Sequence, residues 1–244
     1  MFFPLRDVNP TRTFPFVSYL LLASNVVAFV LMVLNVNQGQ EAFVNELGLV
    51  PARISREPMQ AAYTVFTSMF MHGSLAHLGS NMLFMHVFGD NIEDALGHAR
   101  FLAFYLLCGV AAALAQIGVD PNSAIPMVGA SGAIAGVVGA YLALYPRAPI
   151  VTFNSIFPLW FVIGLFPVVP AWLVAGEFFI ANLLQGIGSL GLQIQGGIAF
   201  FAHLGGFVCG LVLGRLWTQR RADVSPWHGF RRTRYDRSRR SRRW

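Results

Sequence analysis

Long uncharged apolar runs dominate the chain and predict helices that cross a membrane. Such runs cover residues 14–34, 101–117, 131–145 and 198–214. A helix needs about 20 apolar residues to cross the hydrocarbon core of a bilayer. The apolar residues form continuous runs rather than the one-sided stripes of a soluble amphipathic helix. The pattern therefore predicts a polytopic membrane protein.

Six spans are expected when the weaker segments are included. They cover residues 14–34, 77–96, 100–118, 130–145, 168–187 and 198–217. The second is the weakest, because three acidic residues crowd its end within residues 90–94. Residues 150–167 are apolar but interrupted by Pro158 and Pro167, so they are expected to form a loop on the membrane surface. The expected fold class is an all-α polytopic membrane protein, a bundle of six transmembrane helices.

Composition agrees with this interpretation. Apolar residues make up 55% of the chain and charged residues 11%, whereas a soluble domain carries about a quarter charged residues. Cys108 and Cys209 both lie in apolar runs and are expected to be buried thiols that pack as small apolar groups. The polar, proline-interrupted start does not resemble a cleavable signal, so the first helix is expected to be retained.

The distribution of arginine predicts the orientation. There is no lysine, and eleven of the seventeen arginines lie at or beyond Arg215. With both termini inside, only Arg53 and Arg56 face outward, as the positive-inside rule favours. The expected organisation is a cytoplasmic segment (1–13), a six-helix domain (14–217) whose first loop (35–76) is outside, and a disordered cytoplasmic tail (218–244). The arginine-rich tail is expected to contact anionic lipid headgroups rather than nucleic acid.

Polar residues open the second, fourth and sixth spans. In the expected orientation these three spans all descend from the outer surface, so their first turns lie at one depth. The second span carries His77 and Asn81 on one helix face, the fourth opens with Gly129 and Ser131, and the sixth opens with His203. Polar side chains buried in a membrane are costly, so their presence indicates function.

Glycines at every fourth position predict close contact between the fourth and sixth spans, because small residues let helix backbones approach in lipid. These rows consist of Gly132 and Gly136 in the fourth span and Gly206, Gly210 and Gly214 in the sixth. Ser131 begins one row and His203 the other, so hydroxyl and imidazole are expected within hydrogen-bonding reach. This is the geometry of a serine nucleophile activated by a histidine base.

The same residues could stabilise an oxyanion. Asn81 and His77 could donate from the second span, and the Ser131 backbone N–H from a helix N-terminus. No acidic residue is placed to orient His203, because Glu177 is expected at mid-depth in the fifth span, so a Ser–His dyad is expected. Glu177 itself should be protonated or paired, with either a structural hydrogen bond or an influence on gating.

The motifs HGSLAHLGSNMLF, GASGAIAG and AHLGGFVCG, in this order, resemble the three signatures of rhomboid proteases. The resemblance covers residues 14–217. It implies a serine endopeptidase without cofactor that cleaves transmembrane segments of other membrane proteins near the outer face, through an acyl-enzyme. It also implies substrates with small or helix-breaking residues and a mobile fifth helix on the side where substrates enter.

The resemblance assigns roles to six residues. The catalytic pair is Ser131 and His203, the oxyanion-binding pair is His77 and Asn81, and the supporting residues are Gly129 and His72. Family members often carry Trp-Arg shortly before the second span, where this chain has Tyr63 and Thr64.

Three other functions fit the sequence less well. A non-catalytic rhomboid-like protein that binds membrane helices is the main alternative, although such relatives typically lack the serine or the histidine. A transporter would show internal repeats and polar residues at mid-depth. A metal site of His72, His77 and His203 lacks the His-Glu-x-x-His motif of zinc membrane proteases, so no metal is expected. The six-helix core suits a bacterial inner membrane, with the active site toward the periplasm.

Overall fold

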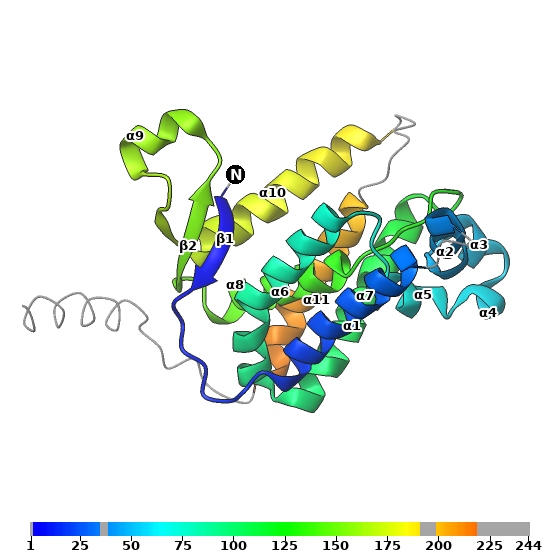
Figure 1. Ribbon diagram of the computed structural model, residues 1–244, viewed down its shortest axis with the longest axis horizontal. Coiled ribbons are helices and arrows are strands. Elements are labelled where there is room, and N and C mark those ends of the chain that lie inside the picture. Colours follow the sequence, from blue (N-terminus) through cyan, green and yellow to red (C-terminus); the bar gives the residue numbers. More distant parts are fainter. Residues whose placement is uncertain (1, 35–38, 191–198, 219–244) are drawn as a thin grey trace, which may run out of the picture.

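The computed structural model describes residues 2–34, 39–190 and 199–218. Six helices form the bundle: α1 (Phe16–Leu34), α6 (Leu75–Leu96), α7 (His98–Val119), α8 (Ser131–Leu144), α10 (Ala171–Ser189) and α11 (Phe200–Trp217) (Figure 1). Each overlaps one of the six expected spans, with ends that differ by up to three residues. Within the described part, α1, α7, α10 and α11 are long and apolar enough to cross a membrane, and α8 is a shorter apolar helix. The count of six spans and their orientation stay predictions, and the tail from residue 219 onward lies outside the described residues.

Short elements occupy the two ends of the bundle. One end carries α2 (Gly39–Leu47), α3 (Pro51–Arg56), α4 (Pro58–Ala61), α5 (Thr64–Thr67) and the 3₁₀ helix η1 (Ser68–Phe70). The opposite end carries β1 (Phe2–Asp7), β2 (Pro149–Asn154), η2 (Phe157–Leu159), α9 (Trp160–Ile163) and β3 (Val168–Pro170). The first loop is folded on itself: Tyr63 Oη donates to the Glu46 carbonyl at 3.2 Å, and the fully buried Thr64 hydroxyl donates to the Ala61 carbonyl at 2.7 Å.

A three-stranded antiparallel sheet corrects the all-α expectation. Its strand order is β1-β2-β3, with Phe2 opposite Asn154 and Ile150 opposite both Asp7 and Val169. The first three residues of the expected fifth span therefore form β3, and the segment expected to be a surface loop contains most of β2. Its β-branched residues favour strand structure, but its partner β1 is more than a hundred residues away in the sequence. Local pattern could not reveal that pairing.

Two acidic residues near the end of α6, which made the second span weak, form hydrogen bonds with residues around the start of α1. Glu93 is fully buried and accepts hydrogen bonds from the backbone N–H groups of Val17 and Ser18 at 2.8 and 2.7 Å and from the Ser18 hydroxyl at 2.7 Å. Asp94 accepts from the Thr13 backbone and hydroxyl at 3.0 and 2.6 Å. A carboxylate at a helix N-terminus satisfies free N–H groups and complements the helix dipole. The carboxylates at the end of α6 are thus compensated by hydrogen-bond donors around the start of α1.

Asp7 fixes the sheet to the bundle. Its carboxylate accepts hydrogen bonds from the Tyr141 hydroxyl at 2.8 Å and from the Asn91 amide at 2.7 Å. Burial, together with the nearby charge of Asp90, raises the pKa of Asp7 to about 7. Side chains of β1, α6 and α8 thereby meet at one end of the bundle.

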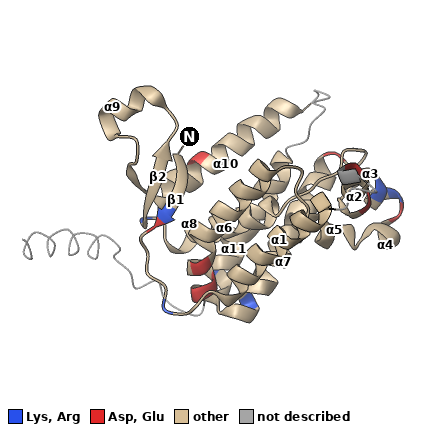
Figure 2. Ribbon diagram, viewed as in Figure 1, with Lys and Arg blue, Asp and Glu red and all other residues tan. Residues whose placement is uncertain are grey.

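Among the residues that the structure describes, charged side chains gather at the two ends of the bundle rather than in its middle (Figure 2). Glu177 lies in the second turn of α10, near the sheet, and its depth in the membrane stays a prediction. Its Oε2 accepts a hydrogen bond from the Phe2 backbone N–H at 2.8 Å, so β1 is tied to α10. Both cysteines are free thiols; Cys108 is buried as expected, whereas Cys209 is only half-buried.

The two glycine rows pack against each other as the spacing predicts. A methyl group added at Gly206 would collide with the Gly132 carbonyl, and one added at Gly210 with the Gly136 carbonyl. A methyl group at Gly214 would lie 2.7 Å from the Ala140 Cβ. The backbones of α8 and α11 therefore touch directly, which brings the first turns of the two helices together.

Gly210→Ala should destabilise the protein, because the added methyl group must push α8 and α11 apart. Overpacking costs about 1–3 kcal/mol, which corresponds to a melting temperature lowered by roughly 3–10 °C in a domain of this size. Gly118→Ala is the control, because Gly118 lies in α7 with no atom within 4 Å of the added methyl group. Thermal unfolding in detergent measures both. Equal melting temperatures for the two variants would contradict the packing argument.

Candidate functional site

The first turns of α6, α8 and α11 meet at the end of the bundle that carries α2–α5. Ser131 is the first residue of α8, and His203 lies in the first turn of α11. The Ser131 hydroxyl and His203 Nε2 are 2.8 Å apart, within hydrogen-bonding distance. The contact expected from the glycine rows is therefore present, between residues seventy-two positions apart in the chain.

A serine cap fixes where α6 begins. The Ser74 side chain accepts a hydrogen bond from the His77 backbone N–H at 3.1 Å, the usual role of serine at a helix N-cap. His77 is thereby held in the first turn, and Asn81 follows one turn later on the same face. The motif before the second span thus sets the direction of both side chains.

Gly129 brings the loop before α8 directly against these two side chains. Its backbone has φ +121°, a conformation that favours glycine, and its N–H donates to the Ser68 carbonyl at 2.8 Å. A Cβ at this position would lie 2.7 Å from His77 Nε2 and 3.6 Å from Asn81 Nδ2. Neither the conformation nor the space admits a side chain. Gly129, His77, Asn81, Ser131 and His203 therefore form one cluster.

Two kinds of unpaired hydrogen-bond donor belong to the cluster that contains Ser131. The first N–H groups of α8, beginning with that of Ser131, have no partner within the helix. Asn81 is only 5% exposed, and its Nδ2 has no hydrogen-bond partner among the described residues. A buried donor left unpaired costs about 1–3 kcal/mol. Unpaired donors of this kind suit an oxygen atom that carries negative charge.

His72 supports the cluster from the loop before α6. Its side chain is fully buried, and its ring lies edge-on to that of His77 with 5.1 Å between centroids. Burial lowers the pKa of His72 to about 4, so the ring is neutral near pH 7. Within the part of the chain that the structure describes, no three His, Cys, Asp or Glu side chains are grouped to hold a metal ion.

Asn182 on α10 is a site residue that the sequence argument missed. Its Oδ1 lies 2.6 Å from His203 Nδ1, and its Nδ2 donates to the Phe178 carbonyl at 2.8 Å. The ring of Phe178 also lies against His203, with 5.9 Å between centroids. Among the described residues an amide contacts the histidine at the position where a carboxylate would complete a triad, and the Ser–His dyad stays a prediction. The rule applied to the other spans, that a polar residue within an apolar helix is significant, would have singled out Asn182.

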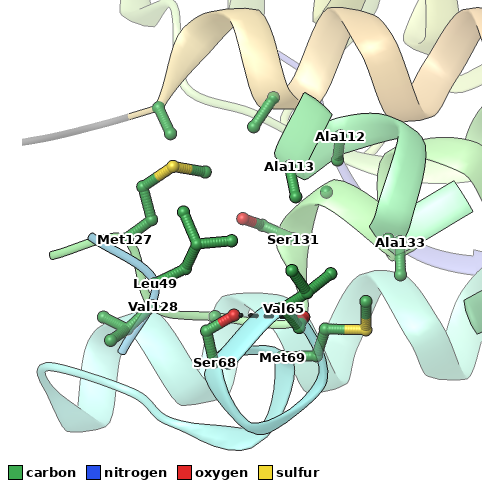
Figure 3. A pocket seen from close by; sticks show the side chains of 15 residues that line it. Leu49, Val65, Ser68, Met69, Ala112, Ala113, Met127, Val128, Ser131 and Ala133 are labelled. Atoms are coloured by element: carbon green, nitrogen blue, oxygen red, sulfur yellow. Dashed lines mark hydrogen bonds between the residues drawn. The ribbon is translucent and has the colours of Figure 1, made fainter. Parts of the chain in front are cut away.

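A small cavity of about 40 Å³ opens beside Ser131. The Ser131 hydroxyl points into it, between Leu49, Met127 and Ala113 (Figure 3). Much of its wall consists of small residues of α7 and α8, including Gly109, Ala112, Gly132 and Ala133. The space next to the hydroxyl is apolar and narrow.

Curated proteins from several kingdoms are similar to this chain. "Rhomboid protein 1, mitochondrial" of Saccharomyces cerevisiae is 28% identical over 66% of this chain and 43% of its own length. "Rhomboid protease GluP" of Bacillus subtilis is 32% identical over 54% of this chain and 26% of its own. "Inactive rhomboid protein 1" of Drosophila melanogaster is 29% identical over 69% of this chain and 10% of its own. The matches thus span less than half the length of each of these relatives.

The names of these relatives include both a protease and an inactive protein. One relative is mitochondrial, so the location of this chain in a bacterial inner membrane stays a prediction. The rhomboid domain family matches residues 59–220, more than half of the chain. The matched region contains all six candidate site residues and Asn182. This chain, a membrane protein by its apolar helices, belongs to the rhomboid family.

Proposed function

We propose that this protein is a serine endopeptidase that cleaves transmembrane segments of other membrane proteins near the outer membrane face. The observation that carries the proposal is the 2.8 Å contact between the Ser131 hydroxyl and His203 Nε2. The unpaired amide of Asn81 near the same residues supports it. Serine and histidine in this arrangement perform acyl transfer on unrelated folds.

In the proposed reaction, His203 Nε2 takes the proton of the Ser131 hydroxyl while the oxygen attacks a peptide carbonyl. The resulting oxyanion accepts hydrogen bonds from the Ser131 backbone N–H, Asn81 Nδ2 and His77. His203 then gives its proton to the departing amine, which leaves Ser131 acylated. Water attacks this ester with His203 again as base, and the acid product and free hydroxyl result. The reaction uses side chains of this chain and no cofactor.

The substrate segment must unwind before it reacts, because a helix engages its own carbonyl groups. A bilayer does not satisfy free backbone groups, so cleavage is proposed near the membrane surface, where water is available. The arginine-rich tail, beyond the described residues, is proposed to contact anionic headgroups and to be dispensable for the chemistry.

The narrow cavity beside Ser131 suits a small side chain on the residue whose carbonyl is attacked. Its volume is about 40 Å³, and alanine and glycine line much of it. We therefore expect substrates with alanine, glycine or serine at that position to be preferred over those with phenylalanine.

Val65→Phe should fill the cavity and lower kcat/KM for an alanine-containing substrate by roughly tenfold or more, since misfit in an apolar pocket costs about 1–3 kcal/mol. Val65 lines the cavity from α5. Val119→Phe makes the same change at an exposed position at the end of α7 and should leave kcat/KM unchanged. Cleavage of a quenched transmembrane peptide measures both. An unaltered rate for Val65→Phe would remove the cavity from substrate recognition.

The test of the proposed function uses purified protein in detergent or proteoliposomes. A fluorophosphonate probe should label the wild type at Ser131, identified by mass spectrometry, and should not label Ser131→Ala. The wild type should also cleave a transmembrane substrate that Ser131→Ala leaves intact. Cleavage by both forms would contradict the proposed function, and so would absence of labelling and cleavage across several substrates, which would favour the non-catalytic alternative.

A further inference from the structure

We propose that Asn182 is a positioning residue that fixes the tautomer and the ring orientation of His203. The inference rests on the proposed function, because it concerns the base of that reaction. It assigns α10 a direct part in the site, although α10 carries none of the three motifs that identify the family resemblance.

The hydrogen bonds of Asn182 determine which end of its amide faces the histidine. The Phe178 carbonyl only accepts hydrogen bonds, so its partner at 2.8 Å is the amide Nδ2 of Asn182. Oδ1 is thereby left to face His203 Nδ1 at 2.6 Å. Since Oδ1 only accepts, Nδ1 must carry the proton.

A proton on Nδ1 leaves Nε2 of the neutral ring with a free lone pair. Nε2 is the atom 2.8 Å from the Ser131 hydroxyl, and only the unprotonated nitrogen can take the hydroxyl proton. The other tautomer would present an N–H to Ser131 and could not act as base. In soluble serine proteases, a carboxylate fixes the tautomer in this way.

Packing supports the same orientation. Phe178 and Asn182 are four residues apart, so they share one face of α10. Phe178 lies against the His203 ring and also against Phe84 and Phe207, with centroid distances of 6.0 and 6.3 Å. The ring is held on one side by an aromatic contact and at its Nδ1 edge by the amide.

An amide suits this position better than a carboxylate would in an apolar helix. Asn182 is only 8% exposed and lies in the fifth expected span. Ionised groups are expensive inside a membrane, whereas the neutral amide accepts the hydrogen bond without introducing charge. This explains how the site orients its histidine without any acidic residue.

The experiment compares Asn182→Leu, Asn182→Asp and Gln185→Leu in the full-length protein. Asn182→Leu keeps the approximate volume but removes the acceptor, whereas Asn182→Asp keeps an acceptor oxygen. Gln185→Leu is the matched control, because Gln185 on the same helix donates a comparable bond to the Ala181 carbonyl at 2.9 Å, is exposed and does not contact His203.

Asn182→Leu should lower kcat and the rate of fluorophosphonate labelling by ten- to a hundredfold with little change in KM. Asn182→Asp should recover part of both, and Gln185→Leu should match the wild type. Thermal unfolding of each variant separates a folding defect from a loss of positioning. Labelling of folded Asn182→Leu at the wild-type rate, or no recovery with folded Asn182→Asp, would overturn the role of Asn182 and leave the proposed function intact. A wild type without Ser131-dependent labelling or cleavage would overturn both.

Discussion

Ser131→Ala and His203→Ala should each lower kcat/KM for a transmembrane substrate by about 10⁴-fold or more, the scale on which catalytic serine and histidine act in serine proteases. The double variant should be no slower than either single variant. The reason is that the two groups perform one step together: without the base the hydroxyl is a weak nucleophile, and without the hydroxyl the base has no proton to take.

The matched controls are Ser24→Ala in α1 and His86→Ala in α6. The Ser24 hydroxyl donates only to its own helix, to the Leu20 carbonyl at 2.8 Å, and His86 is exposed. Neither change should alter kcat/KM. Effects of Ser131→Ala and His203→Ala that multiply in the double variant would show that the residues act independently, which is incompatible with a shared proton transfer.

Asn81→Ala should lower kcat by about 10²- to 10³-fold, as the loss of one oxyanion donor does in other proteases, while leaving the melting temperature nearly unchanged. Asn81 Nδ2 has no partner among the described residues of the resting protein. Its removal therefore breaks no hydrogen bond of that group in the folded state, and the loss appears only when an oxyanion forms.

Asn91→Ala in the same helix should have the opposite effect, a loss of stability without a loss of activity. Asn91 is also buried, but it accepts from Asn9 and donates to Asp7, with distances of 2.5 and 2.7 Å. Its loss should lower the melting temperature by several degrees, since buried groups left unpaired cost about 1–3 kcal/mol each, and should leave kcat unchanged. Paired measurements of kcat and thermal unfolding test both variants. A large loss of stability in Asn81→Ala with normal kcat would remove Asn81 from the oxyanion site.

Much of the candidate site could be predicted because its signals are local. The spacing of His77 and Asn81 places them on one helix face whatever the rest of the fold does. Glycines four residues apart leave one helix face without side chains, so that another helix can pack closely against it. A serine or a histidine at the first turn of such a face must lie near the helix–helix contact. The meeting of Ser131 with His203 follows from these facts once the two helices are known to start at the same level.

Other features were hidden because they depend on partners far away in the sequence. The acidic residues within 90–94 make the second span look weak in the sequence. In the structure, however, Glu93 accepts hydrogen bonds from the first turn of α1. Asn182 is one polar residue among apolar ones in the sequence, and its contact with His203 becomes visible only when α10 is placed next to α11. The pairing of β1 with β2 joins segments about 150 residues apart.

The sequence by itself determined where the six long helices lie, which of their ends carry polar side chains and which helices can touch, because hydrophobicity and helical spacing are properties of neighbouring residues. Only the tertiary structure decided that the amide of Asn182 meets His203, that Gly129 lies against His77 and Asn81, and that a sheet closes the opposite end. Those contacts depend on how whole helices are placed against one another, since a hydrogen bond requires its two atoms to lie within about 3 Å.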